Sequence, residues 1–425
     1  MKKQRKPYIY ILILIILIMQ LFDSYCTDLF DKLQSFLLSD FLMDGRGMHL
    51  QDAVSYMGYV SLPFYAIPVL APLARILIDK IGIKPIFVAN IIILIAGCFL
   101  CAFAPSLFIY LIGNGLVIFS TSMDIQYIYI AEDVPNNRRA TVRGIAAGVA
   151  AAATMLIPLF RSFFVDQRRE SWRSLYRIAL GMGALTVLVS ILLRGNKKKQ
   201  ANIHITETEI TEEQRTPKNC VTENADTIID TKNNKEAIRS FYICLFLFGI
   251  ATTGITAYNE PLLAFGNASE RQIRDVLLIQ PAVTFIINIA SGYLADKINR
   301  KTVILTDMLL SAVALLTYVI SIVLGHTGAV CGIAWGFMIG CYFSAANLMI
   351  LTVLEYADRK RIGRISAASN YANASGNAIG LLFCTVFVKY TGMGAVKLLS
   401  AIPVILLAFI YLKRRNPFEN NPKDS

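Results

Sequence analysis

Long apolar blocks, separated by short polar stretches, run along almost the whole sequence. A helix needs about 20 mostly apolar residues to cross the ~30 Å hydrocarbon core of a bilayer. Blocks of that length lie at 8–34, 53–78, 85–104, 107–131, 143–164 and 172–193, and again at 241–260, 273–295, 302–324, 327–352, 366–388 and 394–412. The pattern therefore predicts an all-α membrane protein with twelve transmembrane helices.

One polar segment divides the twelve blocks into two sets of six. It is rich in Thr, Glu, Asn and Asp and has few large apolar residues, so it lacks the material for a core of its own. We expect an N-terminal six-helix bundle at 1–193, a cytoplasmic linker loop at 194–240, a C-terminal six-helix bundle at 241–412 and a cytoplasmic tail at 413–425.

The basic residues add an orientation to this arrangement. The formal net charge of +12 would suit a nucleic-acid-binding protein, but 29 of the 41 Lys and Arg lie in the tails, the linker and the loops of one side. This is the positive-inside pattern, and it predicts a plasma-membrane protein with both termini in the cytoplasm. It argues against nucleic acid as a partner, because no basic–aromatic face accompanies the charge.

The two halves of the sequence repeat each other in two pairs of loops. Residues 75–84 read RILIDKIGIK and residues 292–301 read GYLADKINRK, so each loop places an Asp at a helix end and a Lys after it. Residues 129–139 (YIAEDVPNNRR) and 354–364 (LEYADRKRIGR) each place an acid at a helix end before an arginine cluster. Two matched pairs in the same order indicate an internal repeat.

These loops resemble those of the major facilitator superfamily of secondary transporters, and the likeness extends over essentially the whole chain. The signature of that family is G-x-x-x-D-[RK]-x-G-x-[RK]. The first loop departs from it at Arg75, which stands at the first glycine, and the second loop departs at Asn299, which stands at the second glycine. The resemblance implies two pseudo-symmetric six-helix bundles.

In that family, charged residues of these loops hold the cytoplasmic gate closed and release it when the bundles rock. The resemblance therefore implies a gating role, with ordinary topology-setting charges as the alternative. Candidate pairs are Asp79 with Arg138, Arg139 or Arg143, and Asp296 with Arg361 or Arg364. The predicted gating residues are Asp79, Lys80, Gly82, Glu132, Arg139, Gly292, Asp296, Lys297 and Arg364.

The first apolar block carries a stripe of polar residues. At about 100° per residue, the side chains of Gln20, Asp23, Thr27 and Asp31 fall on one helix face. Polar groups at membrane depth are expensive and usually face a cavity or a partner. Asp23 is therefore the first candidate for a carboxylate that binds protons or substrate. Asp31 alternatively lies at the outer interface and pairs with Lys32 or Arg161.

The resemblance implies that helices one, four, seven and ten line the transport cavity, and polar residues recur on these helices. Helix eleven also has a polar face, whose residues either contact substrate or join helices through hydrogen bonds. Beyond helix one, the candidate substrate and proton residues are Asp124, Tyr127, Thr256, Asn259, Glu260, Asn347, Asn370 and Asn373.

Nothing in the sequence points to an enzyme. We found no nucleophile triad, no phosphate-binding glycine loop and no metal-ligand cluster, so we expect no cofactor, no bound metal and no use of ATP. The sequence predicts a transporter in the lipid bilayer that moves a small organic solute by alternating access, coupled to protons. The excess of acidic and amide groups favours a neutral polar or cationic solute. Efflux by antiport and a transporter-like receptor without net flux are the alternatives.

Overall fold

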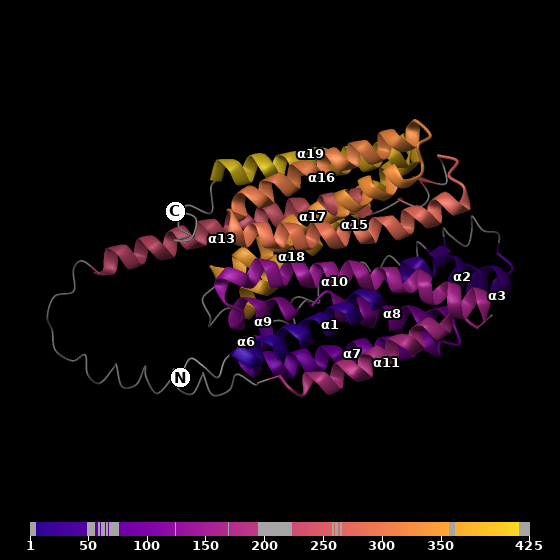
Figure 1. The fold of residues 1–425 in the computed structure, drawn as a ribbon, viewed down its shortest axis with the longest axis horizontal. Helices are drawn as coiled ribbons and strands as arrows, with labels where there is room; N and C mark the ends of the chain where they lie inside the picture. The colour runs from indigo at the N-terminus through magenta and orange to yellow at the C-terminus, as the bar shows by residue number, and fades with distance from the viewer. Residues whose placement is uncertain are drawn as a thin grey trace.

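The computed structural model describes residues 6–48, 56, 57, 60, 64, 67, 76–123, 125–168, 170–193, 223–256, 259, 262, 263, 266–356 and 362–415. Within these residues every regular element is a helix. The long helices have nearly parallel axes and form two bundles that lie side by side (Figure 1).

The first bundle contains the N-terminal half of the chain. In it α1 packs against α10 and α11, and α7 packs against α8 and α11. Its long helices are α1 (Lys6–Lys32), α7 (Ile83–Ala102), α8 (Leu107–Thr121), α9 (Gln126–Asp133), α10 (Arg139–Phe160) and α11 (Arg173–Ser190). Its short elements are α2 (Gln34–Leu38), α3 (Asp44–Arg46), α6 (Ile78–Ile81), the 3₁₀ helix η5 (Asn136–Arg138) and the π-helices η2 (Ser39–Met43) and η6 (Arg161–Gln167).

The second bundle contains the C-terminal half. Its helices are α13 (Glu223–Thr256), α15 (Glu270–Lys297), α16 (Arg300–Val323), α17 (Ala329–Glu355), α18 (Ile362–Thr391) and α19 (Met393–Arg415). In it α13 packs against α18 and α19, while α17 packs against α15 and α16. Helix α13 begins inside the segment expected to be a linker and continues without a break into the seventh apolar block.

The predicted membrane helices are confirmed across the part of the chain that the structure describes. Ten helical spans there are long and apolar enough to cross a membrane, and they match the first, the third to fifth and the seventh to twelfth apolar blocks. The sixth block forms α11, which packs beside α7 and α1. The second block lies mostly outside the described residues.

The fourth predicted helix is interrupted between α8 and α9. The hydroxyl groups of Thr121 and Ser122 both donate hydrogen bonds to the carbonyl oxygen of Ile118, at 3.3 and 2.7 Å. Side-chain bonds of this kind compete with the regular helical hydrogen bonds and bend helices. The helix resumes as α9 at Gln126.

The two repeated loops differ at the position of the second glycine. Gly82 has φ 94°, a conformation that residues with a Cβ atom rarely adopt. Asn299 instead has φ −150°, and its side chain accepts a hydrogen bond from the backbone amide of Thr302 as the N-cap of α16. The first loop therefore needs glycine for its backbone, whereas the second loop uses asparagine to begin the next helix.

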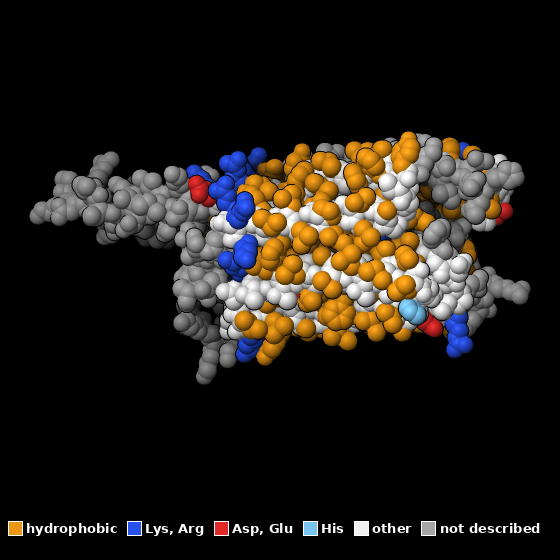
Figure 2. Space-filling model, turned by 90° about the horizontal axis from the view of Figure 1, so that it is seen from above, with side chains coloured by type: hydrophobic (Ala, Val, Ile, Leu, Met, Phe, Trp, Pro, Cys, Tyr) orange, Lys and Arg blue, Asp and Glu red, His pale blue; other side chains and the backbone are white. Residues whose placement is uncertain are grey.

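The face of the molecule seen in Figure 2 is an apolar band with most of its basic side chains at one end. Large exposed apolar side chains come from several helices of both bundles, among them Phe108, Leu188, Ile286, Val323 and Leu382. A surface of this kind suits contact with lipid. The Lys and Arg side chains gather at the end where α1 begins and α19 ends, on the left in Figures 1 and 2, which we call the basic end.

A buried lysine joins the last helix to α13. The ammonium group of Lys397 donates hydrogen bonds to the carbonyl oxygens of Gly254 at 2.9 Å and Ile255 at 3.1 Å, and the residue is 1% exposed. These carbonyl groups belong to the last turn of α13, where helix carbonyls have no partner within the helix and attract cations. Lys397 therefore caps α13 from a neighbouring helix.

Candidate functional site

The two bundles meet where α10 crosses α15, and the two backbones touch there. A Cβ atom added to Gly292 would lie 2.5 Å from the carbonyl oxygen of Ala140 and 2.8 Å from the Cα atom of Gly144. Both distances are too short for real atoms, so any larger residue would push the helices apart. The two glycines therefore set the spacing between the bundles.

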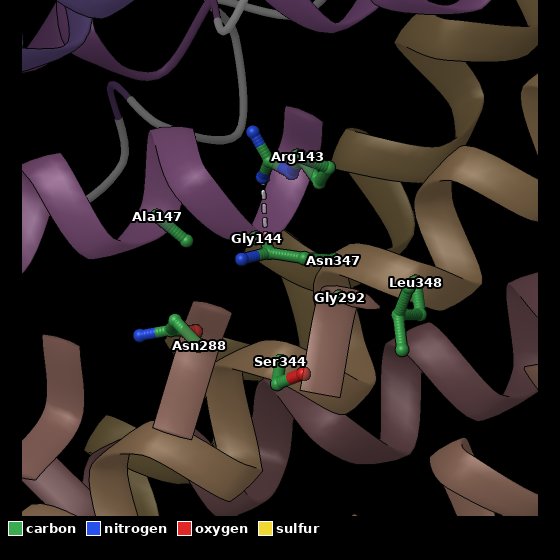
Figure 3. A pocket seen from close by; sticks show the side chains of 8 residues that line it. All are labelled: Arg143, Gly144, Ala147, Asn288, Gly292, Ser344, Asn347 and Leu348. Carbon is green, nitrogen blue, oxygen red and sulfur yellow. Dashed lines mark hydrogen bonds between the residues drawn. The ribbon is translucent and has the colours of Figure 1, made fainter. Parts of the chain in front are cut away.

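A small pocket lies beside this crossing (Figure 3). Its walls come from both bundles, and its polar side chains are a guanidinium group, two amides and a hydroxyl group. The lining residues are Arg143, Gly144 and Ala147 of α10, Asn288 and Gly292 of α15, and Ser344, Asn347 and Leu348 of α17.

Arg143 is the charged side chain of the pocket. It is 2% exposed and donates a hydrogen bond to Oδ1 of Asn347 in the other bundle at 2.5 Å, the dashed line of Figure 3. Its guanidinium group also lies over the ring of Tyr127 from α9. The predicted residues Tyr127 and Asn347 are thus brought together through an arginine that the sequence had associated with the loop.

Asn288 adds a second amide to the pocket. Its Nδ2 atom donates to the carbonyl oxygen of Thr284 at 2.9 Å, while its buried Oδ1 atom has no hydrogen-bond partner among the described residues. A buried acceptor without a partner is uncommon, because the loss of its hydration is not compensated. This atom is therefore available to a bound molecule.

The carboxylate of Asp296 links the bundles at the basic end. It accepts hydrogen bonds from the backbone amides of Ala140 at 3.2 Å and Thr141 at 2.6 Å, in the first turn of α10. The first amides of a helix have no partner within the helix and carry partial positive charge. Asp296 thus lies between the bundles, and its partners are backbone amides. Arg364 lies in α18, and Arg361 is outside the described residues.

Glu355 joins three helix ends at the same level. Its carboxylate pairs with Arg300 at the start of α16, at 2.5 Å, and with Arg139 at the start of α10, at 3.4 Å. Arg139 also donates through Nε to the carbonyl oxygen of Val134 at 2.9 Å. The predicted gating residue Arg139 therefore bonds an acid of the other bundle, in a group that is largely buried.

A second polar group lies inside the N-terminal bundle between α1 and α9. The amide of Gln126 donates to Oε1 of Gln20 at 3.1 Å and to Oδ2 of Asp23 at 3.4 Å, and all three residues are buried. Thr27 donates to the backbone carbonyl of Asp23. The structure thus brings together Gln20, Asp23 and Thr27 and adds Gln126, which was not selected from the sequence.

The remaining predicted residues of the second bundle form local hydrogen bonds along the chain or contact another helix. Thr256 donates to the carbonyl oxygen of Thr252, and the buried Asn259 donates to those of Ile255 and Thr256. The backbone of Asn373 lies against Gly249. Asn370 reaches the other bundle and donates to the carbonyl oxygen of Ser122 at 3.5 Å.

The other predicted residues either are exposed or lie wholly or partly outside the residues that the structure describes. Lys80, Lys297 and Arg364 are exposed, and the ammonium group of Lys297 lies 5.8 Å from the centre of the Tyr293 ring. Asp124 and Glu260 lie outside the described residues, as do the side chains of Asp31, Asp79 and Glu132.

Five residues of the site were missed or underrated by the sequence analysis: Arg143, Asn288, Gln126, Arg300 and Glu355. The sequence could have indicated Arg143 and Asn288, because each lies next to or one turn from a glycine that faces another helix. Charged or amide side chains beside such glycines lie in or next to the helix contact. Gln126 follows the interruption of helix four, which hydropathy does not reveal.

Comparisons with known proteins agree with this architecture. The family model described as Major Facilitator Superfamily matches residues 13–258 and 241–425. The proton:xylose symporter XylE, solved with 6-bromo-6-deoxy-D-glucose, has a TM-score of 0.74 at 12% identity, over 96% of both chains.

Two further solved structures have the same arrangement. The human organic anion transporter MFSD10 (TETRAN) has a TM-score of 0.68 at 14% identity, over 95% of this chain and 99% of its own. The E. coli fucose:proton symporter FucP has a TM-score of 0.64 at 13% identity, over 95% and 98%. A search of curated protein sequences finds no match. The chain is therefore a multi-pass membrane protein that belongs to the major facilitator superfamily, with twelve transmembrane helices in two pseudo-symmetric six-helix bundles.

Proposed function

We propose that the protein is a secondary active transporter that moves a small polar organic solute by alternating access, coupled to protons. Members of its family are transporters rather than enzymes. The observation that carries the proposal is the set of polar contacts between the bundles at the basic end. Asp296 holds the start of α10, and Glu355 holds Arg139.

These contacts suit a gate, because each can be broken without unfolding a helix. A carboxylate that leaves the amides of α10 exchanges them for water, and the same holds for the pair between Glu355 and Arg139. Other contacts between the bundles, at Gly144 and Gly292, consist of closely packed backbone. The polar contacts would therefore open at the basic end, while the packed helices keep the bundles together.

The choice of solute follows from the polar side chains between the bundles. The pocket offers the amides of Asn288 and Asn347, the hydroxyl group of Ser344 and the guanidinium group of Arg143. Such a set matches a solute with several hydroxyl or carbonyl oxygens. Two of the similar structures are proton symporters of the sugars xylose and fucose, which supports a sugar-like or other polyhydroxylated solute.

Proton coupling is assigned to Asp23. Its carboxyl group is buried between α1 and α9 and is bonded by Gln126, an uncharged donor. An ionised carboxylate at this depth is expensive, so a proton would be taken up there before the bundle closes. Release of that proton on the other side would drive uptake of the solute.

The experiment is transport in proteoliposomes. Purified protein is reconstituted with a pH-sensitive dye inside the vesicles, and a panel of sugars, polyols, amino acids and organic cations and anions is added outside. Solute-dependent acidification supports proton symport, and alkalinisation indicates antiport. A ligand that raises the unfolding temperature but produces no flux favours a receptor. The topology, with both termini in the cytoplasm of the plasma membrane, is tested by protease access to terminal tags in intact cells.

A further inference from the structure

A carboxyl group that the proposed mechanism does not use lies inside the C-terminal bundle. Asp307 is 4% exposed, in the third turn of α16. At 1.5 Å per residue this places it roughly 10 Å from the start of the helix at the basic end. An acidic residue at such depth is rare unless it has a functional role or a partner.

The partners of Asp307 are uncharged. The hydroxyl group of Ser291 in α15 donates a hydrogen bond to its Oδ1 atom at 3.1 Å, and Ser344 of α17 lies beside the same carboxyl group. The Oδ2 atom is buried and has no hydrogen-bond partner among the described residues. No Lys or Arg of the described chain forms an ion pair with it, since Arg300, two turns earlier, is bonded to Glu355.

The protonation state of Asp307 that suits these surroundings is the neutral one. Ionised, its donors would be at most the hydroxyl groups of Ser291 and Ser344, with no cation beside it, which is an expensive arrangement in a membrane. Protonated, its hydroxyl group becomes a donor, and the nearby oxygen of Ser344 is an acceptor. A sodium ion would need several more oxygen ligands than the carboxyl group and two hydroxyl groups provide.

Ser344 also connects this carboxyl group to the pocket between the bundles. It lines that pocket together with Arg143, Asn288 and Asn347. Ser291 is adjacent in sequence to Gly292, which lies at the crossing of the bundles. A change of charge at Asp307 is thus separated from the bundle interface by a single layer of side chains.

We propose that Asp307, Ser291 and Ser344 form a proton-binding site of the C-terminal bundle, separate from Asp23. This site takes up and releases its proton through the pocket beside Ser344. The inference deepens the proposed proton coupling and relies on it for a role in transport. Proton binding itself is independent of any solute. Among the described side chains, Cys341 is the other titratable group that lies near Asp307.

Infrared difference spectroscopy of the purified full-length protein tests the site without transport. As the pH is changed, the wild type is expected to show the gain and loss of a protonated-carboxyl C=O band that Asp307→Asn lacks and Asp23→Asn retains. The Ser344→Ala variant, which keeps the carboxyl group, is expected to retain the band with a displaced titration midpoint. Cys341→Ala is expected to leave the band in place.

Two results would overturn the assignment. One is a spectrum of Asp307→Asn that titrates as the wild type does, or, if that variant does not fold, a Ser344→Ala midpoint equal to that of the wild type. The other is a wild-type midpoint that moves when choline is replaced by sodium, which would assign the site to sodium. Absence of coupled flux in proteoliposomes, with the band intact, would count against the proposed function and leave the proton site standing.

Discussion

Asp296 accepts a hydrogen bond of 2.6 Å from the backbone amide of Thr141, and the two residues belong to different bundles. The bond places a negative charge at the positive end of α10. The side chain of Asp296, which belongs to one of the repeated loops, thus forms a contact between the two bundles.

Replacement of Asp296 by Asn should favour the open state of the basic end. The variant keeps the size of the side chain but loses the charge, and charges at helix ends contribute about 1 kcal/mol. The ratio of closed to open molecules should therefore fall about five-fold. Spin labels at the exposed residues Asn137 and Ile298 would report a longer distance in the variant.

The control for Asp296 is its neighbour. Lys297→Gln changes an exposed charge next to Asp296 and should leave the distance distribution unchanged. Equal distributions in the wild type and in Asp296→Asn would show that the bond does not hold the bundles together.

Replacement of Glu355 by Gln should destabilise the protein. Arg300 and Arg139 would lose their common carboxylate in a largely buried position. Breaking such a pair from one side costs about 3–5 kcal/mol, because a cation is left without its partner. The unfolding temperature in detergent should fall, whereas Glu236→Gln, at an exposed position of α13, should not change it.

A double variant separates the charge effect from loss of packing. Arg300→Met together with Glu355→Met removes both charges of the closer pair, so it should be less harmful than Glu355→Gln alone. If the double variant unfolds at the lower temperature, packing rather than charge accounts for the stability.

Replacement of Gly292 by Ala should separate α10 from α15. The added methyl group would meet the carbonyl oxygen of Ala140, and overpacking of this kind costs about 1–3 kcal/mol. The matched control is Gly181→Ala in α11, where an added Cβ has no atom within 4 Å. That control should be neutral or stabilising, since alanine is the better helix former by about 0.5–1 kcal/mol. The unfolding temperature of each variant is compared with that of the wild type, and an equal temperature for Gly292→Ala would contradict the prediction.

Replacement of Asp23 by Asn should abolish coupling to protons but preserve solute exchange. The asparagine can still accept a hydrogen bond from Gln126, so the contact between α1 and α9 remains. Counterflow of labelled solute in proteoliposomes should continue, while solute-dependent proton movement should stop. Asp28→Asn, on another face of α1, serves as the control. Proton movement that persists in Asp23→Asn would transfer the role to another carboxyl group.

The sequence was sufficient for the architecture. Apolar length predicted the membrane helices, and the repeated loops predicted the family and its two bundles, because both features depend on local composition. The burial of Asp23 and Gln20 was also expected, since polar residues on one face of an apolar helix seldom face lipid.

The hydrogen-bond partners that residues find in the other bundle could not be predicted from the sequence. The bond from Asp296 to Thr141 depends on where the start of α10 lies relative to α15, and a loop pattern contains no such distance. Arg143 was assigned to a charged loop because Arg138 and Arg139 precede it, although α10 turns its side chain into the pocket. Asp307 escaped notice because a single acid in an apolar block does not form a stripe.

Lys397 constrains how the protein can be assembled. Its acceptors on α13 lie 143 and 142 residues earlier in the chain, so a ribosome completes them well before the lysine exists. Helix α19 alone would leave the Lys397 ammonium group, in the second turn of the helix, without these carbonyl acceptors. It should therefore enter the membrane against α13 rather than by itself, and the C-terminal half should become stable toward extraction and proteolysis only after its last helix has been synthesised.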